Sequence, residues 1–144
     1  MKHVFLLLLL TVSLGYGQTD EQLIISLLEK ESATWRSGDV AAHADCWSIQ
    51  PYSRIFVSTG DGNSIDVPPA MMINPPENMM GQGGTSKNSN YKMNINGNHA
   101  WVSHDEESTN TEGVKAYTYE IRILEKIEGS WKLVGQSIHP RKMQ

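Results

Sequence analysis

His104 and Glu106 are the two residues whose types and spacing could support proton transfer. They lie two positions apart in residues 99–106, where apolar and polar residues alternate, and this alternation predicts a β-strand. Side chains two apart in a strand point to the same side of a sheet, so a carboxylate would lie beside an imidazole. The carboxylate favours the protonated imidazole, whereas burial opposes it. We therefore take His104 as a candidate catalytic residue.

The same pair also fits a role without chemistry. Residues 104–107 read His-Asp-Glu-Glu, and such a polar run is more often solvated than buried. Small apolar residues at 100 and 102 are expected to face inward, which turns His104 and Glu106 inward and Trp101 outward. A large aromatic residue exposed on a sheet is typical of a protein interface. We therefore expect a homodimer through the outer sheet face that includes Trp101.

Four consecutive antiparallel strands are predicted to hold these residues. Residues 91–97 and 99–106 alternate on either side of Gly97-Asn98, and residues 116–126 and 131–139 alternate on either side of a turn at 127–130. In the third strand we place Tyr117, Tyr119, Ile121 and Ile123 on the inward, apolar face. Thr118, Glu120 and Arg122 are then expected to face outward.

The half before these strands is predicted to be mainly helical. Thr19-Asp20 reads as a helix start, the apolar spacing is helical, and Gly38 suits the helix end. Asp39 is expected to cap a second helix to about residue 47, and residues 52–58 to form a strand. Residues 59–90 are expected to be irregular, with a brief edge strand at 65–67, a short helix at 70–73 and a flexible polar stretch at 81–90. The four methionines in this segment either fill gaps against the sheet or form an adaptable lid.

The N-terminus predicts export. Residues 1–17 contain a basic start, an apolar run and small residues, which is the pattern of a cleavable signal peptide, and we place cleavage near Gly17-Gln18. Residues 18–144 are then one domain in the periplasm or outside the cell. The apolar run is too short to span a bilayer, so no membrane attachment is expected after cleavage. The net charge of −4 offers no basic face for nucleic acid.

The sequence contains no motif for a cofactor or a metal. Gly81, Gly83 and Gly84 precede Lys87 without the Gly-Lys-Ser/Thr order of a phosphate loop. The histidines show no tight spacing, so no metal site is expected. The only cysteine, Cys46, excludes an internal disulfide and is expected to be an inert buried residue.

The order of these segments resembles the nuclear-transport-factor-2-like superfamily, in its SnoaL-like branch of small bacterial proteins. The resemblance rests on residues 35–39 (Trp-Arg-Ser-Gly-Asp), 97–102 (Gly-Asn-His-Ala-Trp-Val) and 129–134 (Gly-Ser-Trp-Lys-Leu-Val). It implies an α+β fold in which a curved antiparallel sheet wraps around the N-terminal helices as a cone, the cystatin-like α+β barrel. It also implies an open, partly apolar pocket and frequent dimerisation. Many relatives carry a histidine on the last strand at the position of Ser137, and here the histidine is His139.

Such a pocket would take its wall and mouth from the helices and the inward sheet face. The residues that we assign to it are Trp35, His43, Trp47, Tyr52, Met93, Glu106, Tyr117, Tyr119 and His139. Three functions follow as alternatives: an exported module that binds a small apolar or aromatic molecule, a cofactor-independent isomerase, cyclase or hydrolase that uses a pocket histidine, or a dimerisation scaffold. The fold alone does not choose among them.

Overall fold

A computed structural model describes residues 18–76 and 78–142, and the predicted signal peptide at 1–17 lies outside this range. The described chain begins with a long helix and a short one, and six strands follow, with a single 3-10 turn between the second and third. The elements are α1 (Asp20–Ser37), α2 (Val40–Ala44), β1 (Ile55–Ser58), β2 (Ser64–Val67), η1 (Pro69–Met72), β3 (Thr85–Asn96), β4 (His99–Thr109), β5 (Lys115–Ile127) and β6 (Ser130–Pro140).

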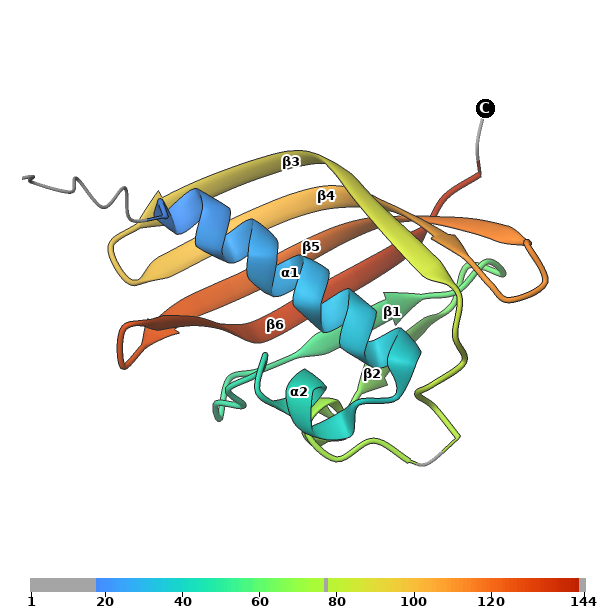
Figure 1. Ribbon diagram of the computed structural model, residues 1–144, viewed down its shortest axis with the longest axis horizontal. Helices are drawn as coiled ribbons and strands as arrows, with labels where there is room; N and C mark the ends of the chain where they lie inside the picture. Colours follow the sequence, from blue (N-terminus) through green and yellow to red (C-terminus); the bar gives the residue numbers. More distant parts are fainter. Residues whose placement is uncertain (1–17, 77, 143–144) are drawn as a thin grey trace, which may run out of the picture.

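The six strands form one curved sheet in the order β2-β1-β6-β5-β4-β3. All neighbouring strands are antiparallel except β1 and β6, which are parallel. Figure 1 shows α1 crossing one face of this sheet, with α2 beside its C-terminal end. The predicted α+β fold and the curved sheet around the helix are confirmed. The sheet stays open, with β2 and β3 as its two edges.

Helix α1 has the local signals that define both of its ends. Thr19 accepts a hydrogen bond from the Gln22 backbone, and the Gln22 side chain accepts one from the Thr19 backbone, which completes a capping box. At the other end Gly38 has φ +76°, a left-handed conformation that glycine adopts readily. Ile24 and Leu28 are fully buried in the core under the sheet. The cap and the apolar face together fix the helix across the sheet.

Two sequence predictions differ from the structure in this part of the chain. The second helix is shorter than expected and ends at Ala44. Residues 85–90, which we expected to be flexible, form the first half of β3 and pair with the end of β4. A bulge between Ser89 and Lys92, with Asn90 at φ +55°, lets this polar half continue into the apolar half. The sequence did not predict this part of β3 because residues 85–90 are all polar and show no apolar alternation.

A second bulge changes which side chains of β6 face the helix. Ile123 pairs with Gly135 and Leu124 pairs with Leu133, so Val134 is an extra residue on β6. Leu133 lies in the buried core before the bulge, and Gln136 and Ile138 face the same side after it. The helix-facing positions of β6 therefore change from odd to even numbers at the bulge.

Candidate functional site

A cavity of about 280 Å³ lies between α1 and the concave face of the sheet. Its wall is formed by residues of α1, β1, β2, η1, β4, β5 and β6, together with Met79 from the segment after η1. The lining residues are Glu31, Ser32, Trp35, Arg36, Ile55, Val57, Val67, Met72, Met79, Glu106, Ser108, Thr118, Glu120, Arg122, Gln136 and Ile138. The volume is close to the lower end of the range for pockets that hold small molecules.

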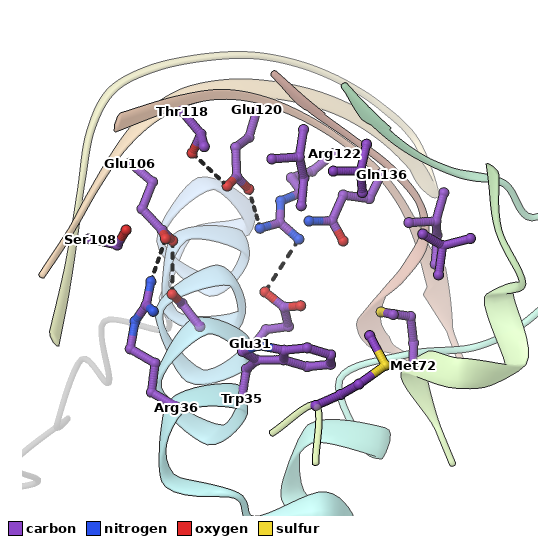
Figure 2. Close-up of a pocket in the computed structure, with 16 residues that line it drawn as sticks. Glu31, Trp35, Arg36, Met72, Glu106, Ser108, Thr118, Glu120, Arg122 and Gln136 are labelled. Carbon is purple, nitrogen blue, oxygen red and sulfur yellow. Dashed lines mark hydrogen bonds and ion pairs between the residues drawn. The ribbon is translucent and has the colours of Figure 1, made fainter. Parts of the chain in front are cut away.

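The wall of the cavity has a polar half and an apolar half. Figure 2 shows the labelled acidic and basic side chains of α1, β4 and β5 converging on one side, with Met72 on the other. The apolar half comes from β1, β2, η1 and β6 through residues that include Ile55, Val57, Val67 and Ile138. A molecule that fits this cavity would need an apolar body and a polar end.

Arg122 lies at the centre of the polar half and is only 3% exposed. Its Nη2 donates to Oε2 of Glu120, and its Nη1 lies 3.3 Å from Oε2 of Glu31. Burial works against the charge of Arg122, but Glu120, Glu31 and Glu106 outweigh it and raise the pKa of the guanidinium. Burial likewise raises the pKa of Glu120, yet the charge of Arg122 and further donors leave that pKa below its ordinary value. Both groups are therefore ionised at neutral pH.

A second ion pair joins α1 to β4 at the edge of the cavity. Arg36 Nη2 lies 2.5 Å from Oε1 of Glu106, and Ser32 donates to Oε2 of Glu106 at 2.8 Å. Ser32 also contacts Ser86 on β3 at 2.8 Å. Burial, followed by the negative charge of Glu120, raises the pKa of Glu106. Glu106 is thus a carboxyl group in the cavity wall that holds its proton more tightly than a free glutamate does.

His104 is close to the polar cluster but does not line the cavity. It is 1% exposed, and its Nε2 lies 3.8 Å from Oε2 of Glu120. Its ring lies at a tilt to that of Tyr91, with 5.3 Å between the two ring centroids. Burial and the charge of Arg122 lower its pKa to about 4. The imidazole is therefore neutral at pH 7. Its inward direction agrees with the sequence analysis, whereas the solvated alternative is wrong.

The aromatic and histidine residues of the helical half occupy three different positions. Trp35 lines the cavity and contacts His43, with 5.1 Å between the two ring centroids. His43 is fully buried behind it, with Nδ1 3.2 Å from the carbonyl oxygen of Glu31. Trp47 belongs to the core and pairs with Leu133. Only Trp35 of these three predicted residues borders the cavity.

Glu106 lines the cavity, whereas the other predicted wall residues lie away from it. Met93 packs against the core on the inner face, as expected. Tyr52 was expected at the entrance of the cavity, but it is not among the residues that line it. It is 64% exposed and donates a hydrogen bond to Glu125. His139 lies on the outer face, where it bonds Ser58 and Ser137 at 2.9 and 2.7 Å. The bulge at Val134 accounts for its position, because it reverses the side that odd-numbered residues of β6 face.

The two faces of β5 are the reverse of our prediction. Glu120 and Arg122 are buried at the cavity, and Thr118 lines it as well. Tyr119 and Ile123 lie on the outer face with 39% and 41% exposure, and Tyr117 shares that face by alternation. The prediction assumed that the apolar side of a strand faces the core. Here the helix-facing side of β5 borders the polar half of the cavity, so charged residues occupy it.

Five residues that matter for this site were missed: Glu31, Arg36, Glu120, Arg122 and Gln136. One signal could have found two of them. Glu120 and Arg122 alternate with apolar residues on one strand, so they share a face on which their opposite charges can pair. The described residues contain no cluster of histidine, cysteine and acidic residues suited to a metal ion. No described helix has the length and apolar character needed to cross a membrane.

No protein-family model and no curated protein sequence matches this chain. Solved structures do match it. An NTF2-like protein of unknown function from Shewanella baltica is 18% identical, with 88% of this chain and all of that one covered and a TM-score of 0.64. An NTF2-like protein from Cytophaga hutchinsonii is 14% identical over 86% of this chain and all of that one, with a TM-score of 0.67.

A third match is described as a putative Ca/calmodulin-dependent kinase II association domain from Exiguobacterium sibiricum. It is 12% identical over 90% of this chain and all of that one, with a TM-score of 0.64. The SnoaL-like branch stays a prediction. At these identities the likeness concerns the fold, and the chain has the nuclear-transport-factor-2-like fold that the sequence resemblance predicted.

Proposed function

We propose that this protein binds a small molecule with an apolar body and a polar end in the cavity between α1 and the sheet. The observation that carries the proposal is the division of the cavity wall into a charged half around Arg122 and an apolar half around Val57 and Met72. Concave sites with an apolar lining and a few convergent polar groups are the usual binding sites for small ligands. From the sequence we expected an apolar or aromatic ligand. The charged half of the cavity wall adds a polar end to that ligand.

Binding is favoured over catalysis by the state of the ionised groups. Arg122 and Arg36 are each engaged by carboxylates, and the neutral His104 lies behind the wall. A general base must reach the proton that it removes, and His104 has no exposed ring nitrogen or hydrogen-bond partner among the described residues. The catalytic role predicted for His104 therefore has little geometric support.

A cofactor-independent isomerase, cyclase or hydrolase is the second candidate because of Glu106. This carboxyl group lines the cavity, and burial raises its pKa above that of a free glutamate, which is the direction that general acid–base catalysis needs. The two functions separate on substitution. In an enzyme, Glu106→Gln abolishes turnover of a bound compound and leaves its affinity nearly unchanged. In a binding protein no turnover exists to lose, and a ligand recovered from the protein is chemically unaltered.

The binding proposal is tested by native mass spectrometry of the purified protein before and after unfolding, and by calorimetric titration with 2-phenylethanol. We expect a released small molecule or saturable binding of the alcohol. Val57→Phe fills the cavity and should abolish binding. Val40→Phe is the matched control, because Val40 is 43% exposed on α2. Equal binding by both variants would place the ligand elsewhere and contradict the proposal.

We also propose that two copies of the chain pair through the outer sheet face. Trp101 and Ile123 are cross-strand neighbours and are each 41% exposed, which makes a continuous apolar surface on β4 and β5. The solved structure from Exiguobacterium sibiricum is described as an association domain, which is compatible with this role. Sedimentation velocity should show a dimer that Trp101→Asp converts to monomer, whereas Tyr52→Asp, at another exposed aromatic, leaves it intact.

Export stays a proposal that rests on residues 1–17. Expression of the full chain in a bacterium should place the protein outside the cytoplasm with an N-terminus near Gln18. N-terminal sequencing of the fractionated protein checks this directly. Full-length protein that accumulates in the cytoplasm would contradict it.

A further inference from the structure

The carboxylate of Glu31 faces the cavity without a hydrogen-bond donor. Its side chain is 7% exposed, and no described residue donates a hydrogen bond to either of its oxygens. Arg122 Nη1 lies 3.3 Å from Oε2 but makes no hydrogen bond. His43 Nε2 lies 3.8 Å from Oε1. A buried carboxylate normally accepts several hydrogen bonds, so this one has unused acceptor capacity.

The groups around Glu31 leave an excess of negative charge. Glu31 and Glu120 share the single guanidinium of Arg122, while Arg36 and Glu106 form a separate, balanced pair. His104 is neutral at pH 7. His43 contacts the carbonyl oxygen of Glu31 through Nδ1, so Nδ1 is the donor, and its Nε2 is too far from the Glu31 carboxylate for a hydrogen bond. The cluster around Arg122 therefore contains two carboxylates for one guanidinium.

Gln136 gives independent evidence for a ligand at the same place. It is 8% exposed, lines the cavity and is the direct cross-strand partner of Arg122. Its amide makes no hydrogen bond with any described residue, whereas buried amides are nearly always satisfied. Figure 2 shows the Gln136 amide and the Glu31 carboxylate both beside the Arg122 guanidinium. Glu31 and Gln136 thus both present polar atoms to one cavity without a hydrogen-bond partner from the described residues.

We propose that the ligand's polar end is an organic cation, of the protonated amine class, held by the Glu31 carboxylate and the side-chain oxygen of Gln136. This inference rests on the proposed binding function. The ammonium group supplies both the missing charge and the missing donors. The apolar body of the ligand then lies against Val57, Met72 and Ile138.

An anionic ligand fits the same wall less well. It would add negative charge to a cluster that already has two carboxylates for one guanidinium. Arg122 is also a poor anion site, because its Nε and Nη1 are covered by the protein and Nη2 is engaged by Glu120. The Arg36 guanidinium likewise already donates a hydrogen bond to Glu106.

The test compares three probes that share a phenyl body: 2-phenylethylamine, 2-phenylethanol and 3-phenylpropanoate. Calorimetric titrations of the purified protein at about pH 8 keep the amine protonated, since alkylamines titrate near pH 10. We expect the amine to bind at least about tenfold more tightly than the alcohol, as a charge-assisted hydrogen bond allows. The carboxylate should bind most weakly.

Two pairs of variants assign the preference to Glu31 and Gln136. Glu31→Gln should remove the advantage of the amine, whereas Glu21→Gln, the same change at an exposed position of α1, should retain it. Gln136→Lys supplies an ammonium from the protein itself and should also remove the advantage. Gln136→Met has similar length and no charge, but it removes the amide oxygen, so the advantage of the amine should become smaller without disappearing. Neither Gln136 variant replaces Arg122 or one of the two glutamates that pair with it. These two variants therefore test the inference even if Glu31→Gln does not fold.

The outcomes separate the inference from the function on which it rests. If the alcohol or the carboxylate binds as tightly as the amine, the cation preference is wrong and the binding function stands. Retention of the full amine advantage in Gln136→Lys overturns the inference as well. If none of the three probes binds, both the inference and the proposed function fall.

Discussion

Arg122→Met is expected to lower the free energy of unfolding by about 3–5 kcal/mol at pH 7, which is the usual cost of removing one partner from a buried ion pair. Arg122 is 3% exposed and is the only described cation that contacts Glu120 and Glu31. Methionine keeps most of the apolar stem, so the change removes charge and donors and leaves only a small void. Two buried carboxylates then remain without a counter-ion.

The pH dependence of this loss identifies its cause. In the native protein the pKa of Glu120 lies below the ordinary 4.5, so Glu120 stabilises the fold above that pH and the stabilisation disappears as acid protonates it. Without Arg122, burial dominates and raises the pKa of Glu120 above 4.5. A carboxyl group with a raised pKa destabilises the fold at high pH and ceases to do so once it is protonated. The difference between variant and native protein should therefore shrink as the pH falls from 7 towards 4.5, the ordinary pKa of a glutamate.

Urea unfolding followed by tryptophan fluorescence measures both effects. Arg54→Met is the matched control, because Arg54 pairs with Asp66 at the surface with 64% of its side chain exposed. That change should cost less than about 1 kcal/mol. Adding Glu120→Gln to Arg122→Met should recover part of the loss. A cost for Arg122→Met as small as that of Arg54→Met, or a loss that grows as the pH falls, would refute this account of the cluster.

Three further predictions concern the fold. Gly84→Ala should destabilise the protein by clearly more than Gly62→Ala. Both glycines have positive φ, but the new Cβ at position 84 would overlap the carbonyl oxygen of Thr109, whereas the space at position 62 is open. Equal melting temperatures for the two variants would contradict this. Thr19→Ala removes the helix cap and should cost about 1 kcal/mol in urea unfolding; no loss would mean that the cap is not needed. The thiol of Cys46 is fully buried, and burial raises its pKa to about 11. A thiol reagent such as DTNB should therefore react with it only on unfolding. Rapid labelling of the native protein would be inconsistent with this burial.

Local signals allowed much of the fold to be predicted. The capping box at Thr19 and the left-handed Gly38 fix the ends of α1. The turns at Gly97 and Gly129, both with positive φ, fix two of the three hairpins that join β3 to β6. These features depend on residues close together in the sequence, so one sequence suffices to find them. The start of β3 was missed because its polar half pairs with polar residues of β4 and carries no apolar period.

The site was harder to predict because the assignment of faces requires information from neighbouring strands. The apolar residues of β5, with Ile123 beside Trp101, lie on the outer face, where they form the surface that we propose for a partner. The charged residues of β5 face α1, because Arg122 forms ion pairs with Glu31 on the helix and with Glu120 on the same strand. A strand with an interface on its outer side and the polar half of a cavity on its inner side has its apolar residues outside and its charged residues inside. For such a strand, opposite charges on facing elements indicate the inner side better than hydrophobicity does.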